Sequence, residues 1–177
     1  MSVLIVSTGL GASPKSLILA REAERVLRAD GTARTLLDLR KLTLPLCGTD
    51  KSFADPKVAR GLALVSAASA ILVATPIYNY DANAVAKNFI ELTGQGWENK
   101  VVGFLCAAGG HASHMSIMAL ANSLMLDFRC VIIPRFVYAT SAAFTADGTI
   151  ADANIAARVA DCARTAVKLA AALKTAR

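Results

Sequence analysis

The sequence contains no long uninterrupted hydrophobic run, although its composition is apolar. Hydrophobic residues make up 55% of the 177 residues, and the mean hydropathy is +0.48. The longest nearly apolar segment, residues 62–74, carries Ser66 and Ser69 and is soon followed by Pro76. Because a membrane-spanning helix needs about 20 apolar residues, this segment is too short to cross a bilayer. The chain has the ordinary length of one domain with a sizeable core.

Closely spaced cysteines, a basic stripe and an export signal are also missing. The four cysteines form no C-x-x-C pair and are interpreted as small buried side chains: Cys47, Cys106, Cys130 and Cys162. Nineteen Lys and Arg against thirteen Asp and Glu give a net charge of +6, but these cations are spread along the chain. This distribution argues against nucleic acid and favours phosphorylated or acidic small molecules as ligands. Without a basic leader or cleavage signature, we expect a cytoplasmic protein.

Strand and helix patterns alternate along the whole chain. Short apolar or β-branched runs predict strands at 3–6, 35–39, 70–74, 101–106 and 130–137. Helical periodicity predicts helices at about 14–29, 55–68, 85–92, 115–126 and 151–175. Pro76 is expected to end the third strand. The alternation predicts one α/β domain over residues 1–177: a three-layer sandwich with a five-stranded parallel sheet of order 2-1-3-4-5 and helices on both faces.

The loop after the first expected strand, STGLGASPKS at residues 7–16, fails two nucleotide-binding motifs. Pro14 stands where a dinucleotide fingerprint needs its third glycine, and it also replaces the glycine that precedes Lys-Ser in a P-loop. The amides and the positive dipole end of a helix N-terminus still favour an anion. We therefore predict a site for one phosphate group at Ser7, Gly9, Ser13, Lys15 and Ser16, with the hydroxyl of Thr8 nearby. The alternative is ordinary capping of the helix by Ser13, with Pro14 in its first turn.

Two further loops are expected at the same edge of the sheet, where the strands end and such folds bind ligands. The loop after the third strand offers two flat aromatic surfaces, Tyr78 and Tyr80, on either side of Asn79, which tolerates a left-handed turn. After the fourth strand, the pair 109–110 (Gly-Gly) permits close approach of the backbone to a ligand. Two nearby histidines, His111 and His114, lack a third ligand and do not indicate a metal. One phosphate beside aromatic surfaces suggests a mononucleotide.

The helix expected at 115–126 has apolar residues on two sides. Its core stripe is separate from a second stripe that contains Met115, Met118, Asn122 and Met125. Such a helix either contributes additional core or contacts a partner. We hypothesise that this helix forms the interface of a homodimer or tetramer.

Residues 75–92, TPIYNYDANAVAKNFIEL, resemble the TPEYN…P..LKNAID signature of the NADPH-dependent FMN reductase family. This family belongs to the flavodoxin-like superfamily and includes azo and quinone reductases. The resemblance extends to the serine-rich first loop, to DLRKLTLPL after the second strand and to the glycine pair after the fourth. It implies that Ser7, Ser13, Lys15 and Ser16 surround the FMN phosphate. It also implies that the isoalloxazine ring is bordered by Pro76, Ile77, Tyr78, Asn79 and Tyr80, and on its pyrimidine side by Ala108, Gly109 and Gly110.

Three features depart from the family pattern. Ile77 replaces the usual glutamate, the stretch from His111 to His114 replaces a more glycine-rich one, and the usual arginine of the first loop has no counterpart within that loop.

The resemblance implies that NADPH or NADH reduces bound FMN, which then reduces a quinone, azo compound, free flavin or metal ion. Because flavin supplies the redox chemistry, no catalytic acid, base or nucleophile and no protein-bound metal is expected. Two alternatives stay open. One is a flavodoxin-type electron carrier, which the basic charge disfavours, and the other is a flavodoxin-fold binding or regulatory protein that has lost FMN affinity.

Overall fold

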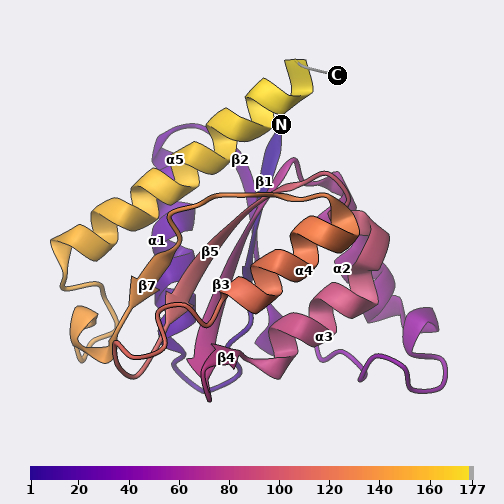
Figure 1. Ribbon diagram of the computed structural model, residues 1–177, viewed down its shortest axis with the longest axis horizontal. Helices are drawn as coiled ribbons and strands as arrows, with labels where there is room; N and C mark the ends of the chain where they lie inside the picture. Colours follow the sequence, from indigo (N-terminus) through magenta and orange to yellow (C-terminus); the bar gives the residue numbers. More distant parts are fainter. Residues whose placement is uncertain (176–177) are drawn as a thin grey trace.

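The structure is a computed structural model, and it describes residues 1–175 (Figure 1). Its strands are β1 (Ser2–Ser7), β2 (Ala33–Asp38), β3 (Ala70–Tyr78), β4 (Asp81–Ala82), β5 (Val101–Ala107), β6 (Val131–Ile132) and β7 (Val137–Ala139). Its α-helices are α1 (Lys15–Ala29), α2 (Pro56–Ala67), α3 (Ala84–Thr93), α4 (Met118–Phe128) and α5 (Ala153–Thr175). A short 3₁₀ helix, η1 (Leu39–Lys41), follows β2. None of the helices within residues 1–175 is both long and apolar enough to cross a membrane.

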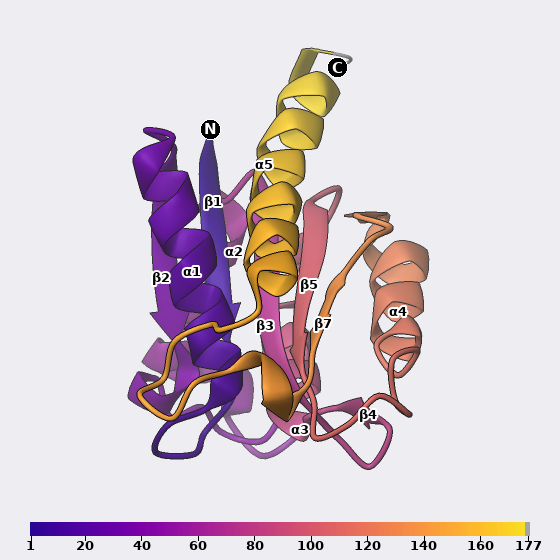
Figure 2. The same ribbon diagram turned by 90° about the vertical axis from the view of Figure 1, so that its left-hand side faces the viewer.

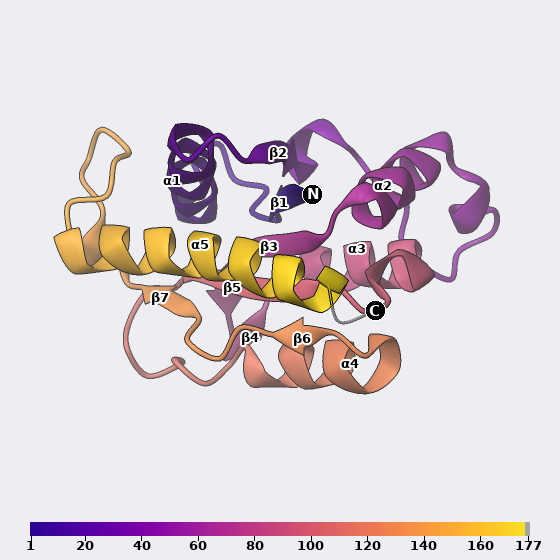
Figure 3. The ribbon, with the colours of Figure 1, turned by 90° about the horizontal axis from the view of Figure 1, so that it is seen from above.

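The strand order β2-β1-β3-β5-β6, which runs from top to bottom in Figure 3, confirms the predicted order 2-1-3-4-5. The number of strands differs, because the described residues form seven strands. The predicted fifth strand is divided into β6, which pairs with the start of β5, and β7, which pairs with its end. Pro134 lies in the bend between them and has no amide to donate to a ladder. The remaining addition, β4, is a two-residue antiparallel partner of β3.

The helices cover both faces of the sheet, with α1 and α5 on one side and α2, α3 and α4 on the other (Figures 1 and 2). Side chains alternate between these two layers along a strand. In β1, Val3 and Ile5 belong to the core under α1 and α5, whereas Leu4 and Val6 belong to the opposite core. Strands buried on both faces need no polar alternation, which explains the continuous apolar run in β3.

Pro76 does not end β3, so this prediction is wrong. Pairing with β5 continues through Pro76, which lies opposite Ala107, and β3 ends only at Tyr78. The carbonyl of Pro76 accepts a hydrogen bond from the Asn83 amide at 3.2 Å, and Asn83 also contacts the loop that follows β1. Pro76 therefore faces the side on which β1 has already ended at Ser7. No ladder partner requires a donor there, so a proline is tolerated.

The cysteines are free thiols, and three of them are buried as predicted. Burial raises the pKa of Cys130 to about 11 and that of Cys162 to about 12. Burial also raises the pKa of Cys106, which is completely enclosed. Cys47 is half-buried. The three buried thiols therefore act as packing groups and stay protonated at neutral pH.

Candidate binding site

A cleft of about 380 Å³ opens at the edge of the sheet where the strands end. Figure 2 shows the loop before α1, the β3–β4 hairpin and the loop that follows β5 gathered at this edge. The cleft is lined by Gly11, Ala12, Ser13, Pro14, Lys15, Pro76, Ile77, Tyr78, Ala107, Ala108, Gly109 and Ser141. Four segments that are far apart in the sequence, the fourth contributing Ser141, thus form one concave surface.

Seven predicted site residues line this cleft: Ser13, Lys15, Pro76, Ile77, Tyr78, Ala108 and Gly109. The other six lie beside or behind it. Ser7, Gly9 and Ser16 are buried beneath the first loop, whereas Asn79, Tyr80 and Gly110 are exposed next to lining residues. Sequence reasoning missed Gly11, Ala12, Pro14, Ala107 and Ser141. The first three lie inside the motif already singled out, but nothing in the sequence around Ser141 indicated the cleft.

The first loop presents a helix N-terminus without a side-chain cap. Pro14 occupies the N-cap position of α1 and no side-chain hydrogen bond caps the helix, so the alternative interpretation, capping by Ser13, is wrong. Ser13 is exposed on the wall of the cleft instead. The first-turn amides and the helix dipole therefore favour an anion at this point. Lys15 adds a positive charge, and its Nζ lies 5.8 Å from the ring centroid of Phe144.

Two buried hydroxyl groups lie behind this loop. Within the described residues, the Oγ atoms of Ser7 and Ser16 are buried without a hydrogen-bond partner. A Cβ at Gly9 would come within 2.6 Å of both Ser16 Oγ and Pro14 Cβ, so the loop requires glycine there. A buried hydroxyl without a partner costs about 1–3 kcal/mol. Unpaired donors beside an uncapped helix N-terminus fit a loop built to hold an anionic group.

The β3–β4 hairpin places two tyrosines on the rim. Tyr78 pairs with Asp81, which leaves Asn79 and Tyr80 as a two-residue turn. Their φ values are 49° and 67°, and a type I′ turn requires positive φ at both positions. Asparagine tolerates this conformation, but the bulky Tyr80 is strained by about 1–3 kcal/mol. Tyr78 and Tyr80 are 60% and 57% exposed, so their rings are free to contact a flat ligand.

Asn83 connects the first loop to the end of β3. Its Nδ2 donates to the carbonyl of Thr8 at 2.8 Å, and its Oδ1 accepts from the hydroxyls of Thr8 at 2.8 Å and Thr75 at 3.1 Å. The same Oδ1 accepts from the Ala86 amide at 3.2 Å and caps α3. Sequence reasoning missed this residue. An asparagine directly before a helical run does signal an N-cap, but nothing local predicts its contacts with Thr8 and Thr75.

The walls of the cleft are held from outside by two further side chains. Arg40, in η1, donates from Nη1 to the carbonyl of Ala12 at 2.8 Å. On the opposite wall, the Tyr138 hydroxyl donates to the carbonyl of Gly110 at 2.6 Å. Both contacts fix loop carbonyls, and neither Arg40 nor Tyr138 lines the cleft.

The two histidines after the glycine pair, His111 and His114, are exposed and do not line the cleft. Among residues 1–175, no group of three or more His, Cys, Asp or Glu side chains could hold a metal ion.

The fold and the cleft together define a flavodoxin-like α/β protein with its binding loops at the carboxyl edge of a parallel sheet. Residues 1–145 match the family model described as NADPH-dependent FMN reductase. This match spans most of the 177 residues, so the chain belongs to the NADPH-dependent FMN reductase family.

Known proteins with related sequences and structures agree with this assignment. The chain is 28% identical over 142 residues to an NAD(P)H-dependent FAD/FMN reductase of Geobacillus thermodenitrificans, which covers 79% of this chain and 77% of the relative. Its fold is similar to that of FerB, a flavoenzyme NAD(P)H:(acceptor) oxidoreductase from Paracoccus denitrificans, with a TM-score of 0.77, 19% identity and 96% of each chain covered. It is also similar to that of an azoreductase from Bacillus anthracis, with a TM-score of 0.67, 17% identity, and 94% of this chain and 99% of that one covered. At these low identities the two structures show a shared fold.

FMN is the cofactor and NADPH or NADH the co-substrate that belong to this family. The residues of the cleft fit FMN on structural grounds. The uncapped start of α1 and Lys15 suit a phosphate, and the apolar wall beside the tyrosine rim suits a flat ring.

Proposed function

We propose that this protein is an NAD(P)H-dependent oxidoreductase that uses FMN bound in the cleft to reduce a small acceptor, namely a quinone, azo compound, free flavin or metal ion. One observation carries the proposal: the uncapped N-terminus of α1 and Tyr78 of the β3–β4 hairpin border the same cleft. A phosphate site beside a surface for a flat ring fits a flavin mononucleotide.

The phosphate of FMN is assigned to the first loop and the ring to the end of β3. Ser13 and Lys15 contact the phosphate in this proposal, while Ser7, Gly9 and Ser16 form the base of the loop. The ring is bordered by Pro76, Ile77, Tyr78, Asn79 and Tyr80, and its pyrimidine side by Ala108, Gly109 and Gly110.

When bound, FMN supplies the hydride chemistry, and the task of the protein is to orient it and exclude water from one face. Ile77 is buried and apolar, which suits the water-excluding side of the ring. The Ala108 amide donates to the Ala139 carbonyl at 2.9 Å, so the start of the glycine loop is fixed to β7. The exposed rings of Tyr78 and Tyr80 would border the open side of the cleft, where nicotinamide and then the acceptor would bind in turn.

We also propose that the chain forms a homodimer, or a tetramer built from it, through α4 and the turn before it. Ile117, Leu120 and Leu124 are buried in the core. Four large apolar side chains of this segment point away from the core and are exposed: Met115, Met118, Met125 and Leu126. Methionine adapts its shape to an apolar partner surface. Sedimentation as a pure monomer would contradict this interface.

We also place the protein in the cytoplasm, in keeping with its four free thiols.

The main proposal is tested by titrating the purified protein with FMN and recording the visible spectrum. Oxidation of NADPH and NADH is then followed with a quinone, an azo dye, excess free flavin and ferric ion as acceptors. We expect bound flavin and turnover with at least one acceptor. Absence of both flavin binding and turnover would contradict the proposal. Flavin binding with only one-electron transfer to a protein partner would favour an electron carrier, and normal folding without flavin affinity would favour a binding or regulatory protein.

A matched pair of lysine variants tests whether FMN binds in the cleft. Lys15→Ala removes the positive charge at the start of α1, and we expect it to weaken FMN binding about tenfold, because a charge-assisted hydrogen bond to phosphate is lost. Lys168→Ala removes an exposed lysine of α5, outside the cleft, and should leave FMN binding unchanged. Equal effects of the two substitutions would exclude the first loop as the phosphate site.

A further inference from the structure

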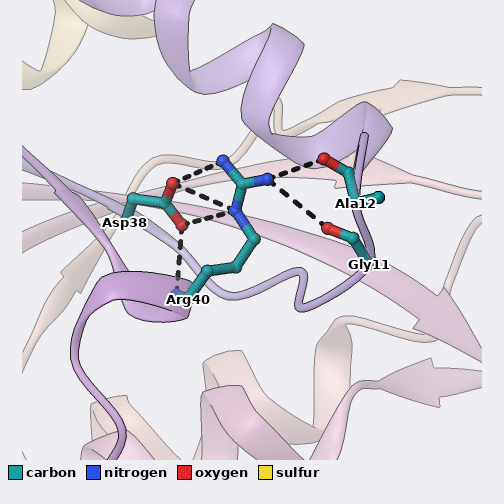
Figure 4. Close-up of polar contacts among 4 residues, drawn as sticks. All are labelled: Gly11, Ala12, Asp38 and Arg40. Atoms are coloured by element: carbon teal, nitrogen blue, oxygen red, sulfur yellow. Dashed lines mark hydrogen bonds and ion pairs between the residues drawn. The ribbon is translucent and has the colours of Figure 1, made fainter.

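Arg40, in η1, connects Asp38 at the end of β2 to the first loop. Its Nη1 donates to the carbonyl of Ala12 at 2.8 Å and lies 3.4 Å from the carbonyl of Gly11 (Figure 4). Ala12 and Arg40 are 28 positions apart in the sequence. The guanidinium lies between Asp38 on one side and the loop on the other.

These contacts determine where the loop amides point. In a trans peptide, the carbonyl and the following N–H point in opposite directions, and the described chain has no cis peptide bond. Arg40 binds the carbonyls of Gly11 and Ala12. The amides that follow these carbonyls, those of Ala12 and Ser13, therefore point away from Arg40. Gly11, Ala12 and Ser13 line the cleft, so a ligand in the cleft meets a loop whose amide orientation is fixed from behind.

Arg40 is itself held rigidly at the end of β2. Asp38 accepts from Arg40 Nε at 3.0 Å and from Nη2 at 2.6 Å, and it also accepts from the Arg40 backbone amide at 3.1 Å. The side chain of Arg40 is only 24% exposed and that of Asp38 only 10%. The hydrogen bonds from Arg40 hold the pKa of Asp38 below its ordinary value, so the pair is ionised at neutral pH. Because Asp38 neutralises the guanidinium and Arg40 does not line the cleft, Arg40 acts through the loop rather than on the ligand.

We propose that Arg40 is a positioning residue for the phosphate group of FMN: it fixes the carbonyls of Gly11 and Ala12 so that the first loop presents its amides to the cleft. This inference rests on the proposed function, because it takes FMN as the occupant of the cleft. Arg40 reaches the first loop from η1, which directly follows β2.

The test compares the dissociation constants of FMN and riboflavin, which differ only by the phosphate, using quenching of flavin fluorescence. We expect Arg40→Ala to weaken FMN about tenfold and riboflavin less than twofold, because the loss concerns hydrogen-bond geometry at the phosphate alone. Arg40→Lys should share most of this loss, since lysine lacks the planar fork that joins Asp38 to the loop. Arg164→Ala is the matched control, because Arg164 forms a similar two-bond pair with Asp30 in which both side chains are more exposed.

The outcomes separate the two proposals. If wild-type protein binds no FMN, the proposed function fails and this inference fails with it. If wild-type protein binds FMN but Arg40→Ala weakens FMN and riboflavin equally, or weakens neither, Arg40 has no positioning role and the proposed function stands. Should Arg40→Ala not fold, the ratio of the FMN and riboflavin constants for Arg40→Lys decides the question.

Discussion

Replacing Asn83 with alanine tests how the two main loops of the cleft are held together. Asn83 is only 6% exposed, and its amide group contacts the loop after β1, the end of β3 and the first turn of α3. Loss of this side chain should lower the free energy of unfolding and loosen the cleft.

The expected loss of stability depends on which hydrogen-bond partners of Asn83 find another partner once its side chain is removed. The Thr75 hydroxyl also lies 3.2 Å from the Pro76 carbonyl, and the Thr8 hydroxyl lies 3.4 Å from the Ala74 carbonyl, so both keep an acceptor. The buried Thr8 carbonyl loses the Nδ2 donor, which costs about 1–3 kcal/mol. Removal of an N-cap from α3 costs about 1 kcal/mol more. We therefore expect Asn83→Ala to destabilise the protein by about 2–4 kcal/mol.

Urea unfolding followed by circular dichroism measures this loss. Asn122→Ala, at an exposed position of α4, is the control and should change stability by less than about 0.5 kcal/mol. Asn83→Asp keeps the acceptor that caps α3 but turns a carboxylate oxygen towards the buried Thr8 carbonyl, so it should also be less stable than the wild type. A loss below about 1 kcal/mol for Asn83→Ala would refute the view that this residue joins the two loops.

Three further perturbations follow from the same structure. Gly103→Ala should destabilise the protein by about 1–3 kcal/mol through overpacking, because the new Cβ would lie 2.8–3.0 Å from three buried side chains. The loss should appear as a lower urea midpoint, and an unchanged midpoint would contradict the packing around β5. The Asp38 carboxylate has a lowered pKa in the folded state, so the stability it provides is fully present above its ordinary pKa of 3.8 and is lost as pH falls further. The difference in stability between the wild type and Asp38→Asn should therefore be constant near neutral pH and shrink below pH 3.8, and a difference that persisted undiminished at lower pH would argue against the ion pair. Cys47 should react with a thiol reagent at pH 8 in the folded protein while the buried cysteines do not, so Cys47→Ser should abolish rapid labelling.

Much of the fold was predictable because it depends on local patterns. Short apolar runs separated by helical periodicity predicted the parallel strands and their order, since few topologies accommodate alternating strands and helices. The same rule placed the loops after β1, β3 and β5 at one edge, and the structure brings Ser13, Tyr78 and Gly109 into one cleft there. Resemblance in the segment 75–92 then pointed to the family that the match over residues 1–145 shows.

One error was local, because Pro134 signals the break that divides the predicted fifth strand, whereas two others concern residues whose surroundings differ from what the local pattern suggests. Pro76 remains inside β3 because β1 has ended beside it, and the start of α1 lacks the serine cap that its sequence suggested. For Pro76 the local chemistry was assessed correctly, but the position of the adjacent strand decided the outcome.

The amino-acid sequence alone determined the layers, the strand order and the edge of the sheet at which the cleft lies, because these follow from periodicity and chain connectivity. Only the tertiary structure showed how that edge is held. Asn83 lies 75 positions from Thr8, and Arg40 lies 28 from Ala12. Hydrogen bonds over such separations depend on the register of neighbouring strands and the paths of the loops between them, which no local pattern specifies.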